Sequence, residues 1–549
     1  MMRSARDGGD VVPGAAARGG DVVSGAVLAG RTEGVVRAVR ALRAAGALAV
    51  VFALSSALAG CMVGPDFVRP TPDVPDRFAE APQHDVAAGP PSRWWQAFGD
   101  PELDALVDRA VAANLDLAVA ESRIREARAA RKIAAAPLFP MLDGSAGLTR
   151  QWQSENAGFV GGGPVGDLGG QPFNLYEAGF DASWEIDVFG GTRRAVEAAD
   201  ADVAASVEQR NDVLLTLIGE VARNYVELRG YQRELAVAKG NVATQEDTLT
   251  LTRARFQGGL ASDLDVARAE AQVRTTAARL PALDTSIRQS IHRLSVLLGD
   301  TPGALLAELT PPAPIPPAPP GLPDGLPSDL VRRRPDVRRA EQEIAATTAR
   351  VGVATADLYP RFYLTGATGL QSLQASDFFE GASKFWSFGP QIQWPIFQGG
   401  RIVGNIRVQE EREQQALLGW RQTILGALEE AENAIVAYTR ERERRTTLAA
   451  AVDANQRAVD LAQALYTRGL TDFLDVLQAQ GNLFLTQTEL VRSDASVSAS
   501  LVALNKALGG GWQTYLPAPD GRGNDAVVDA APAPLACAAC DPTSAASRS

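Results

Sequence analysis

Residues 254–266 read ARFQGGLASDLDV, and residues 464–476 read ALYTRGLTDFLDV. The two stretches align without a gap, and both contain a Gly-Leu step followed by Leu-Asp-Val. The same register continues to residues 298–299 and 508–509, which are Leu-Gly in both places. A match at one constant offset indicates that a single structural unit is duplicated within the chain. The contents of that unit therefore decide the fold and the function.

A very long helix is expected before each repeated turn. Apolar residues recur in steps of three and four from Val203 to Leu235 and again from Leu417 to Tyr438. No proline occurs between Thr192 and Phe256, and a helix of about 60 residues would be about 90 Å long. Alanines on several helix faces favour a ring of helices, with a long bundle or coiled coil as the alternative. Shorter helices are expected at 103–136, 262–298, 336–357 and 471–508.

Two pairs of strands are expected, one pair in each copy. Residues 142–152 and 176–188 alternate between apolar and polar side chains, as do 386–396 and, more weakly, 362–370. Segments of this length and pattern suit a transmembrane β-barrel, and half-buried strands of a soluble sandwich are the alternative. Four strands are too few for a barrel, because about eight are the practical minimum. Strands in lipid would therefore have to be pooled between chains, and three chains would supply twelve.

The N-terminal region predicts export and lipid attachment. Residues 1–34 show no core pattern and are predicted to be a mis-assigned extension, with the true start near residue 35. Residues 35–60 read as a signal peptide, because the basic start precedes an apolar run too short to span a bilayer. The run ends Leu-Ala-Gly before Cys61, as in a bacterial lipobox, so we expect a diacylglycerol and an acyl chain on Cys61. A chance cysteine after an ordinary cleavage site is the alternative.

Composition leaves little material for catalysis. The chain of 549 residues has a net charge of −12, which argues against nucleic acid as a partner. Two histidines, three cysteines and no phosphate-binding loop predict neither an enzyme nor a cofactor or metal site. Cys537 and Cys540 form a CxxC pair in the tail, residues 512–549, which we expect to be disordered, with a redox or metal pair as the alternative.

The repeats define the domain organisation. The first copy is predicted to span residues 94–300 and the second residues 329–511. Residues 301–328 between them are rich in proline and predict a stiff, polyproline-type connector outside the core.

The chain resembles the outer-membrane factors of Gram-negative tripartite efflux pumps of the RND type, in the TolC-like, NodT-like lipoprotein branch. The resemblance extends over most of the mature chain and is carried by CMVGPDFVRP at 61–70, WWQAFGDP at 94–101, RRPDVRRAE at 333–341 and the Tyr-Pro step at 359–360. It implies a mixed α+β membrane protein. In a homotrimer, four strands per chain would build an outer-membrane β-barrel that continues into a long periplasmic α-helical barrel. Residues 61–93 and the connector would lie in an equatorial region.

The same resemblance implies a function and a set of partners. The chain would be the passive outer-membrane exit duct for small molecules such as drugs. It would receive them from an inner-membrane RND transporter and a periplasmic adaptor, and it would be lipid-anchored in the outer membrane. The channel of a type I secretion system and a non-conducting periplasmic coiled-coil lipoprotein are the alternatives.

The repeated turns are the predicted docking sites for the adaptor. They lie at the ends of the long helices farthest from the strands, so they form the periplasmic tip. Gly259 and Gly469 permit a tight reversal, and Leu260 and Leu470 offer apolar contact. The alternative is that the glycines only end a helix and the leucines pack internally.

Four aspartates after the turns are candidates for the periplasmic gate: Asp263, Asp265, Asp472 and Asp475. In a trimer each would occur three times around one axis, and rings of carboxylates favour cations. For Asp263 and Asp472 the alternative is capping of the helix N-terminus. For Asp265 and Asp475 it is a favourable position in the first helical turn. Arg333, Arg334 and Asp336 are interpreted as structural, with Pro335 at a helix start.

Overall fold

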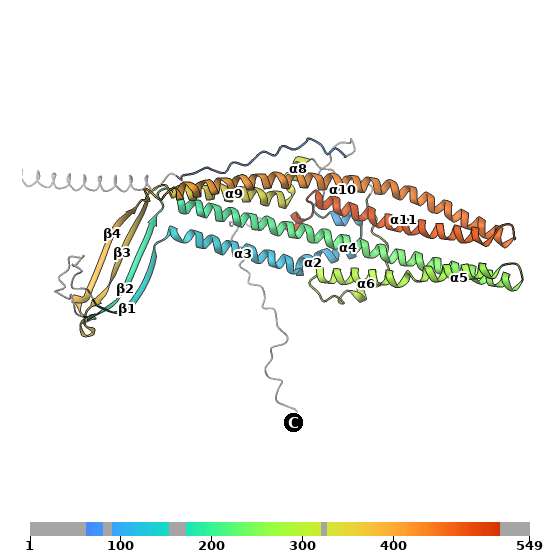
Figure 1. Ribbon diagram of the computed structural model, residues 1–549, viewed down its shortest axis with the longest axis horizontal. Helices are drawn as coiled ribbons and strands as arrows, with labels where there is room; N and C mark the ends of the chain where they lie inside the picture. The colour runs from blue at the N-terminus through green and yellow to red at the C-terminus, as the bar shows by residue number, and fades with distance from the viewer. Residues whose placement is uncertain (1–61, 81–90, 153–171, 320–326, 516–549) are drawn as a thin grey trace, which may run out of the picture. The chain divides into compact units, whose positions relative to one another are not determined.

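The computed structural model describes residues 62–80, 91–152, 172–319 and 327–515 (Figure 1). The predictions for the N-terminal extension, the signal peptide, Cys61 and the Cys537/Cys540 pair lie outside these residues. Of the helices described, none combines the length and the apolarity that a bilayer span requires.

Two helices of equal length dominate the structure, as the sequence predicts. They are α4 (Gly191–Gln257) and α10 (Arg401–Thr467), each of 67 residues. Each is preceded by a glycine in the left-handed region, Gly190 with φ 78° and Gly400 with φ 84°. Side chains other than glycine rarely adopt this conformation, which explains the Gly-Gly step before each helix.

The return helices differ between the two copies. The second is a single helix, α11 (Phe473–Ala507), but the first is broken into α5 (Asp263–Ala277) and α6 (Leu280–Leu297). The prediction of one continuous helix over 262–298 is therefore wrong. Pro281 explains the break, because proline donates no backbone hydrogen bond and its ring clashes with the carbonyl four residues earlier.

The shorter helices that precede each strand pair in the chain also differ from the prediction at one point. The structure has α9 (Pro335–Ala356) as predicted, whereas the helix expected at 103–136 is divided into α2 (Pro101–Ala113) and α3 (Leu115–Ala135). Asn114 lies between them in an extended conformation. Its side chain caps α3 by accepting from Leu117 N at 2.9 Å and donates to Leu297 O.

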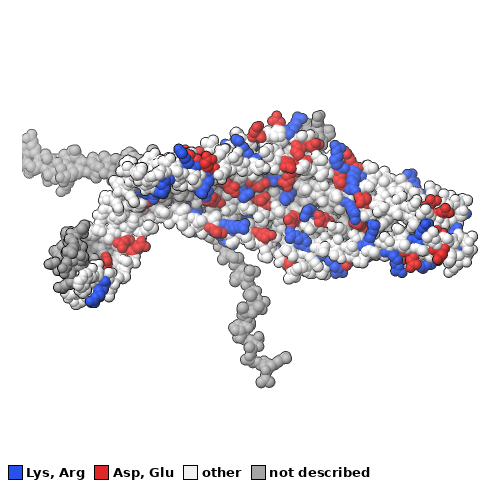
Figure 2. All heavy atoms as spheres, in the orientation of Figure 1, with Lys and Arg blue, Asp and Glu red and all other residues white. Residues whose placement is uncertain are grey.

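All four predicted strands are present and form one antiparallel sheet in the order β1-β2-β3-β4. They are β1 (Met141–Trp152), β2 (Pro172–Ile186), β3 (Arg361–Ser372) and β4 (Lys384–Gln393). The β1–β2 strand pair meets the β3–β4 strand pair where Gly179 of β2 pairs with Gly369 of β3. A Cβ atom on Gly369 would lie 2.4 Å from the carbonyl oxygen of Ala178, so this contact requires glycine. In the view of Figure 2 the sheet is mostly uncharged, and most charged side chains lie over the helices.

The helices form a single layer of neighbours around α4. On the side of the strands α4 contacts α3 and α9, and α9 contacts α10. Beyond them α4 contacts α5, α6 and α11, and α11 contacts α10 (Figure 1). We call α4 with α5 and α6 the first hairpin, and α10 with α11 the second hairpin. All four strands join the helices at one end, and the turns α4–α5 and α10–α11 lie at the other.

The WWQAFGDP motif supplies part of the main core. In the short helix η1 (Trp94–Phe98) both tryptophans are buried, and they pack with the middle of α4 and with α2 and α6. Asp100 caps α2 by accepting from Glu102 N at 3.0 Å, and its other oxygen accepts from the Tyr225 hydroxyl at 2.7 Å. The motif thus ties the start of the first copy to its long helix.

The connector was predicted to lie outside the core, but part of it is buried there. It contains a short helix, α7 (Leu306–Leu309), and both Leu305 and Leu309 are buried in the main core cluster. Its last residues begin α8 (Pro327–Arg333), in which Leu330 is also buried. Leu305 and Leu309 are buried although prolines surround them, because moving an apolar side chain out of water is favourable.

The predicted tail also begins later than expected. Trp512–Tyr515 forms the short helix η5, and Trp512 is 2% exposed. Its indole N–H donates to the carbonyl of Arg333 at 3.2 Å. The prediction of disorder from residue 512 is therefore wrong for these four residues, and the rest of the tail lies outside the described part of the chain.

The structural interpretation of Arg334 is confirmed. Its guanidinium is bound by the carboxylates of Asp336 and Glu430, both at 2.7 Å, and by the carbonyl of Ala507 at 2.9 Å. Pro335 occupies the first position of α9. The arginine thereby joins α9, α10 and α11.

Candidate functional site: the paired helical turns

The two repeated turns have the same backbone geometry. Gly259 and Gly469 have φ of 71° and 75°. The N–H of Leu260 bonds to the carbonyl of Arg255 at 2.8 Å, and that of Leu470 bonds to Leu465 at 3.0 Å. This is the Schellman arrangement, in which a left-handed glycine ends the helix. Leu260 and Leu470 are each 69% exposed, so they do not pack internally. The structure places all four predicted docking residues on the surface of two adjacent turns.

The turns are held together by an apolar cluster and by one arginine. Side chains of both hairpins form the cluster: Leu249, Ala269, Val273, Tyr466, Phe473 and Val476. The half-buried Arg255 of the first hairpin donates to the carbonyl of Thr467 in the second at 3.1 Å. Its guanidinium also lies 4.5 Å from the centre of the Tyr466 ring. Arg255 was not predicted from the sequence. The signal that could have identified it is the departure from the repeat, because the equivalent residue of the second copy is Leu465.

Asp265 has a structural partner. The Ser262 hydroxyl accepts from Asp265 N at 3.2 Å, and the Asp265 carboxylate accepts from Ser262 N at 3.1 Å, which completes a capping box. Ser262 is therefore the cap of α5, and the capping alternative for Asp263 is wrong. Asp263 lies exposed in the first turn of the helix.

The aspartates of the second turn divide in the same way. Asp475 accepts a hydrogen bond from the Thr471 hydroxyl. Asp472 occupies the cap position of α11, but its side chain makes no capping hydrogen bond. Among the described residues, Asp263 and Asp472 accept no side-chain hydrogen bond, and both are exposed. Of the four gate candidates, these two are therefore the ones whose carboxylates are not used in hydrogen bonds of their own turn.

A series of polar contacts follows the seam between the hairpins. Every seventh residue of α4 from Glu234 to Arg255 makes a polar contact with the second hairpin. The pairs are Glu234–Arg492, Asn241–Gln487, Thr248–Gln480 and Arg255–Thr467. A coiled coil would place apolar residues at such heptad positions, and polar residues there fix the register while lowering stability. We call these four contacts the polar ladder.

A partly open polar cavity of about 310 Å³ also lies along the seam. It is lined largely by carboxamide side chains of α4, α10 and α11. Gln245 is 3% exposed, and neither its amide nitrogen nor its amide oxygen has a partner among the described residues. An underpacked seam of polar contacts lets the hairpins separate at a lower free-energy cost than an apolar seam would.

The sheet has two free edges. The outer edges of β1 and β4 pair with no other strand of the described chain, and every residue of β1 is exposed. Unpaired edges are templates for pairing with another chain.

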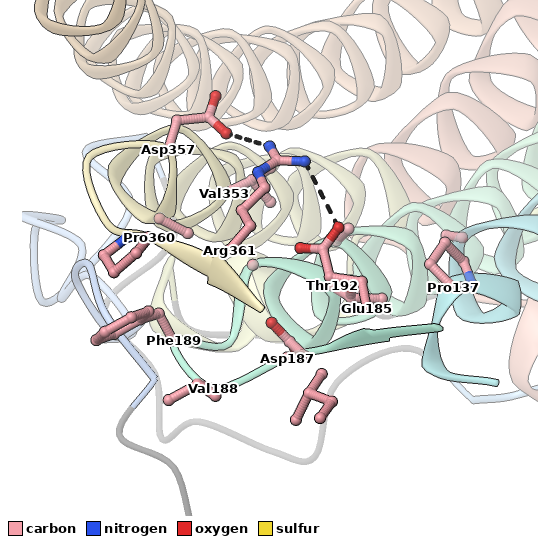
Figure 3. A pocket seen from close by; sticks show the side chains of 15 residues that line it. Pro137, Glu185, Asp187, Val188, Phe189, Thr192, Val353, Asp357, Pro360 and Arg361 are labelled. Atoms are coloured by element: carbon pink, nitrogen blue, oxygen red, sulfur yellow. Dashed lines mark hydrogen bonds and ion pairs between the residues drawn. The ribbon is translucent and has the colours of Figure 1, made fainter. Parts of the chain in front are cut away.

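The junction between sheet and helices is fixed by ion pairs. Figure 3 shows Arg361, at the start of β3, between the carboxylates of Asp357 and Glu185. These residues line a cavity of about 340 Å³ between β2, β3, α4 and α9. Arg361 lies 2.5 Å from Asp357 and 3.6 Å from Glu185, so it links the end of α9 to the neighbouring strand.

The first described residues are bound at this junction. Val63 N bonds to Phe189 O at 3.2 Å, directly after β2. Arg194 of α4 is 2% exposed and donates to Val63 O, to Gly64 O and, at 2.6 Å, to the Asp66 carboxylate. This places the chain that follows Cys61 at the end of the helices that meets the sheet.

An open four-stranded sheet joined to helical hairpins of this length is the arrangement that the resemblance implies for a subunit of an outer-membrane channel. The comparisons establish the family. The chain belongs to the outer membrane efflux protein family, whose model matches residues 106–300 and 326–510.

Relatives and solved structures agree with this assignment. Nodulation protein T of Rhizobium leguminosarum bv. trifolii is 33% identical over 457 residues, which cover 83% of this chain and 95% of that protein. The pyoverdine export outer membrane protein OpmQ of Pseudomonas aeruginosa is 32% identical over 422 residues, covering 77% and 88%. The outer-membrane channel OprN superposes with a TM-score of 0.75 at 34% identity, covering 82% of this chain and 100% of that one.

These findings confirm the predicted class, function and location. The chain is an outer-membrane exit duct for efflux, with a long helical extension into the periplasm. Its relatives are channel and transport proteins.

Proposed function

We propose that three copies of this chain form one duct. Their sheets would join edge to edge, β4 of one copy beside β1 of the next, into a closed β-barrel. The single observation that carries this proposal is the open sheet of four strands with two free edges. Closure requires about eight strands or more, and a barrel removes every edge. Their helices would form the periplasmic α-barrel in the same way.

The duct would take small molecules from an inner-membrane RND transporter through a periplasmic adaptor. Relatives are named for export of pyoverdine and for efflux of toluene, which supports small molecules as the cargo class. The adaptor would contact the exposed Leu260 and Leu470 at the turns. Lipid on Cys61 would anchor the chain in the outer membrane.

The gate would lie at the same turns. In a trimer Asp263 and Asp472 would form rings of carboxylates, which bind and select cations. The gate would open when the second hairpin moves away from the first along the polar ladder, after release of the Arg255 contact with Thr467.

Adaptor docking is tested with the double variant Leu260→Ser/Leu470→Ser. We expect loss of dye efflux and of adaptor cross-linking, with unchanged trimer mass and unchanged conductance in planar bilayers. Leu461→Ser, at a leucine that is 64% exposed on α10 but outside the turns, is the matched control. Normal efflux by the double variant would show that the turns are not the docking site.

A further inference from the structure

A pocket under the proline-rich connector has an unusual charge. Its volume is about 600 Å³, within the range of ligand sites. Arg233 of α4 and Arg442 and Arg445 of α10 line it, and Asp494 of α11 is its only acidic lining residue. The whole chain carries a net charge of −12, so this positive wall reverses the local sign.

The rim of the pocket is rigid. Connector residues 314–318 form one side, and proline-rich backbone holds an extended shape. Two hydroxyl groups fasten it to the helices, because Ser498 donates to Pro316 O at 2.8 Å and Tyr438 donates to Pro319 O at 3.1 Å. A preformed site loses little conformational entropy when a ligand binds.

The arginines differ in how far they are already engaged. Arg445 is paired with Asp494, and Arg442 is also already engaged, with its guanidinium 5.5 Å from the centre of the Tyr438 ring. Arg233 is exposed and makes no ion pair or hydrogen bond within the part of the chain that the structure describes. Its charge is therefore available at the pocket.

We propose that this pocket binds an organic anion that presents a carboxylate to Arg233 and Arg442, such as a short acidic peptide. Guanidinium groups offer paired N–H donors that match a carboxylate. Ile315 and Val497 supply apolar surface for the rest of the ligand. The prolines of the rim have no N–H to offer a carboxylate, whereas each arginine has several. The proposal goes beyond the duct and does not depend on it.

The test measures binding of a C-terminally amidated pentapeptide of alternating alanine and glutamate, labelled with an uncharged fluorescent dye, to the purified full-length protein in detergent. Fluorescence anisotropy should show saturable binding that weakens as salt is added. The same peptide with glutamine in place of glutamate should not bind. The double variant Arg233→Ser/Arg442→Ser should bind at least about tenfold more weakly, because both charged donors to the carboxylate are lost.

Two folded variants keep the test decisive. Arg223→Ser, on the same helix but outside the pocket, removes one positive charge, as the Arg233→Ser change does, and should bind like the parent protein. Asp494→Asn removes the acidic lining residue and should bind more tightly. Absence of binding to the parent protein, equal binding of the glutamine peptide, or an equal loss in Arg223→Ser would overturn the proposal.

Discussion

The contact between Arg255 and the second hairpin yields the sharpest prediction. Arg255→Ala removes the hydrogen bond to the Thr467 carbonyl, at 3.1 Å, and the stacking over Tyr466, at 4.5 Å. A hydrogen bond from a charged donor contributes roughly 1.5 kcal/mol, and a half-exposed cation–π contact contributes about 0.5 kcal/mol. The sum, about 2 kcal/mol per subunit, corresponds to an increase of about 30-fold in the ratio of separated to closed turns.

Single-channel recording in planar bilayers measures this change as open probability. Arg253→Ala is the matched control, because Arg253 lies two residues earlier on α4 and pairs with Glu270 of the same hairpin at 3.1 Å. It removes the same charge from the same turn without crossing the seam. We expect a large rise in open probability for Arg255→Ala and little change for Arg253→Ala. Equal behaviour of the two variants would show that charge at the turn, and not the contact between hairpins, sets the gate.

Four further variants test other contacts in the structure. Burial raises the pKa of the Asp212 carboxyl, and the nearby Asp336 adds to the shift. The native state therefore holds this proton more firmly than the unfolded state, and stability falls as pH rises from the ordinary value through the raised pKa. Asp212→Asn should accordingly raise the melting temperature at neutral pH, with a gain that shrinks toward pH of about 4; a gain that grows on acidification would contradict this. Arg194→Met should increase hydrogen exchange at the Val63 amide at least about tenfold, since two or more charged hydrogen bonds to this segment are lost. Unchanged exchange would show that Arg194 does not hold it. Ser262→Ala should destabilise the start of α5 by about 1 kcal/mol, seen as faster exchange, without altering ion selectivity. Asp472→Ala should lower the cation preference of the channel. A change in selectivity for Ser262→Ala and none for Asp472→Ala would show that the exposed aspartates do not form the gate.

The sequence was sufficient for the architecture because repetition and periodicity are strong signals. Both helices of 67 residues and all four strands follow from apolar spacing, and the turn glycines follow from the repeat. The break before Pro281 was visible in the sequence and was missed because the repeat suggested equal return helices. The burial of Leu305 and Leu309 was hidden by the prolines that surround them.

The site was less predictable for a physical reason. The Arg255 contact joins residues 212 positions apart and ends on a backbone carbonyl, so the identity of Thr467 carries no signal for it. The aspartates could be located from the repeat, but only the structure separates Asp265, which completes a capping box, from Asp263, which does not. Local hydrogen bonds of this kind depend on which of several neighbouring polar residues takes the cap position.

Native mass spectrometry of the protein extracted from the outer membrane tests the pooled barrel most directly. The two free sheet edges predict an assembly of three copies that withstands mild detergent and conducts ions when transferred to a bilayer. A folded single copy that conducts, or an assembly of another size, would contradict it.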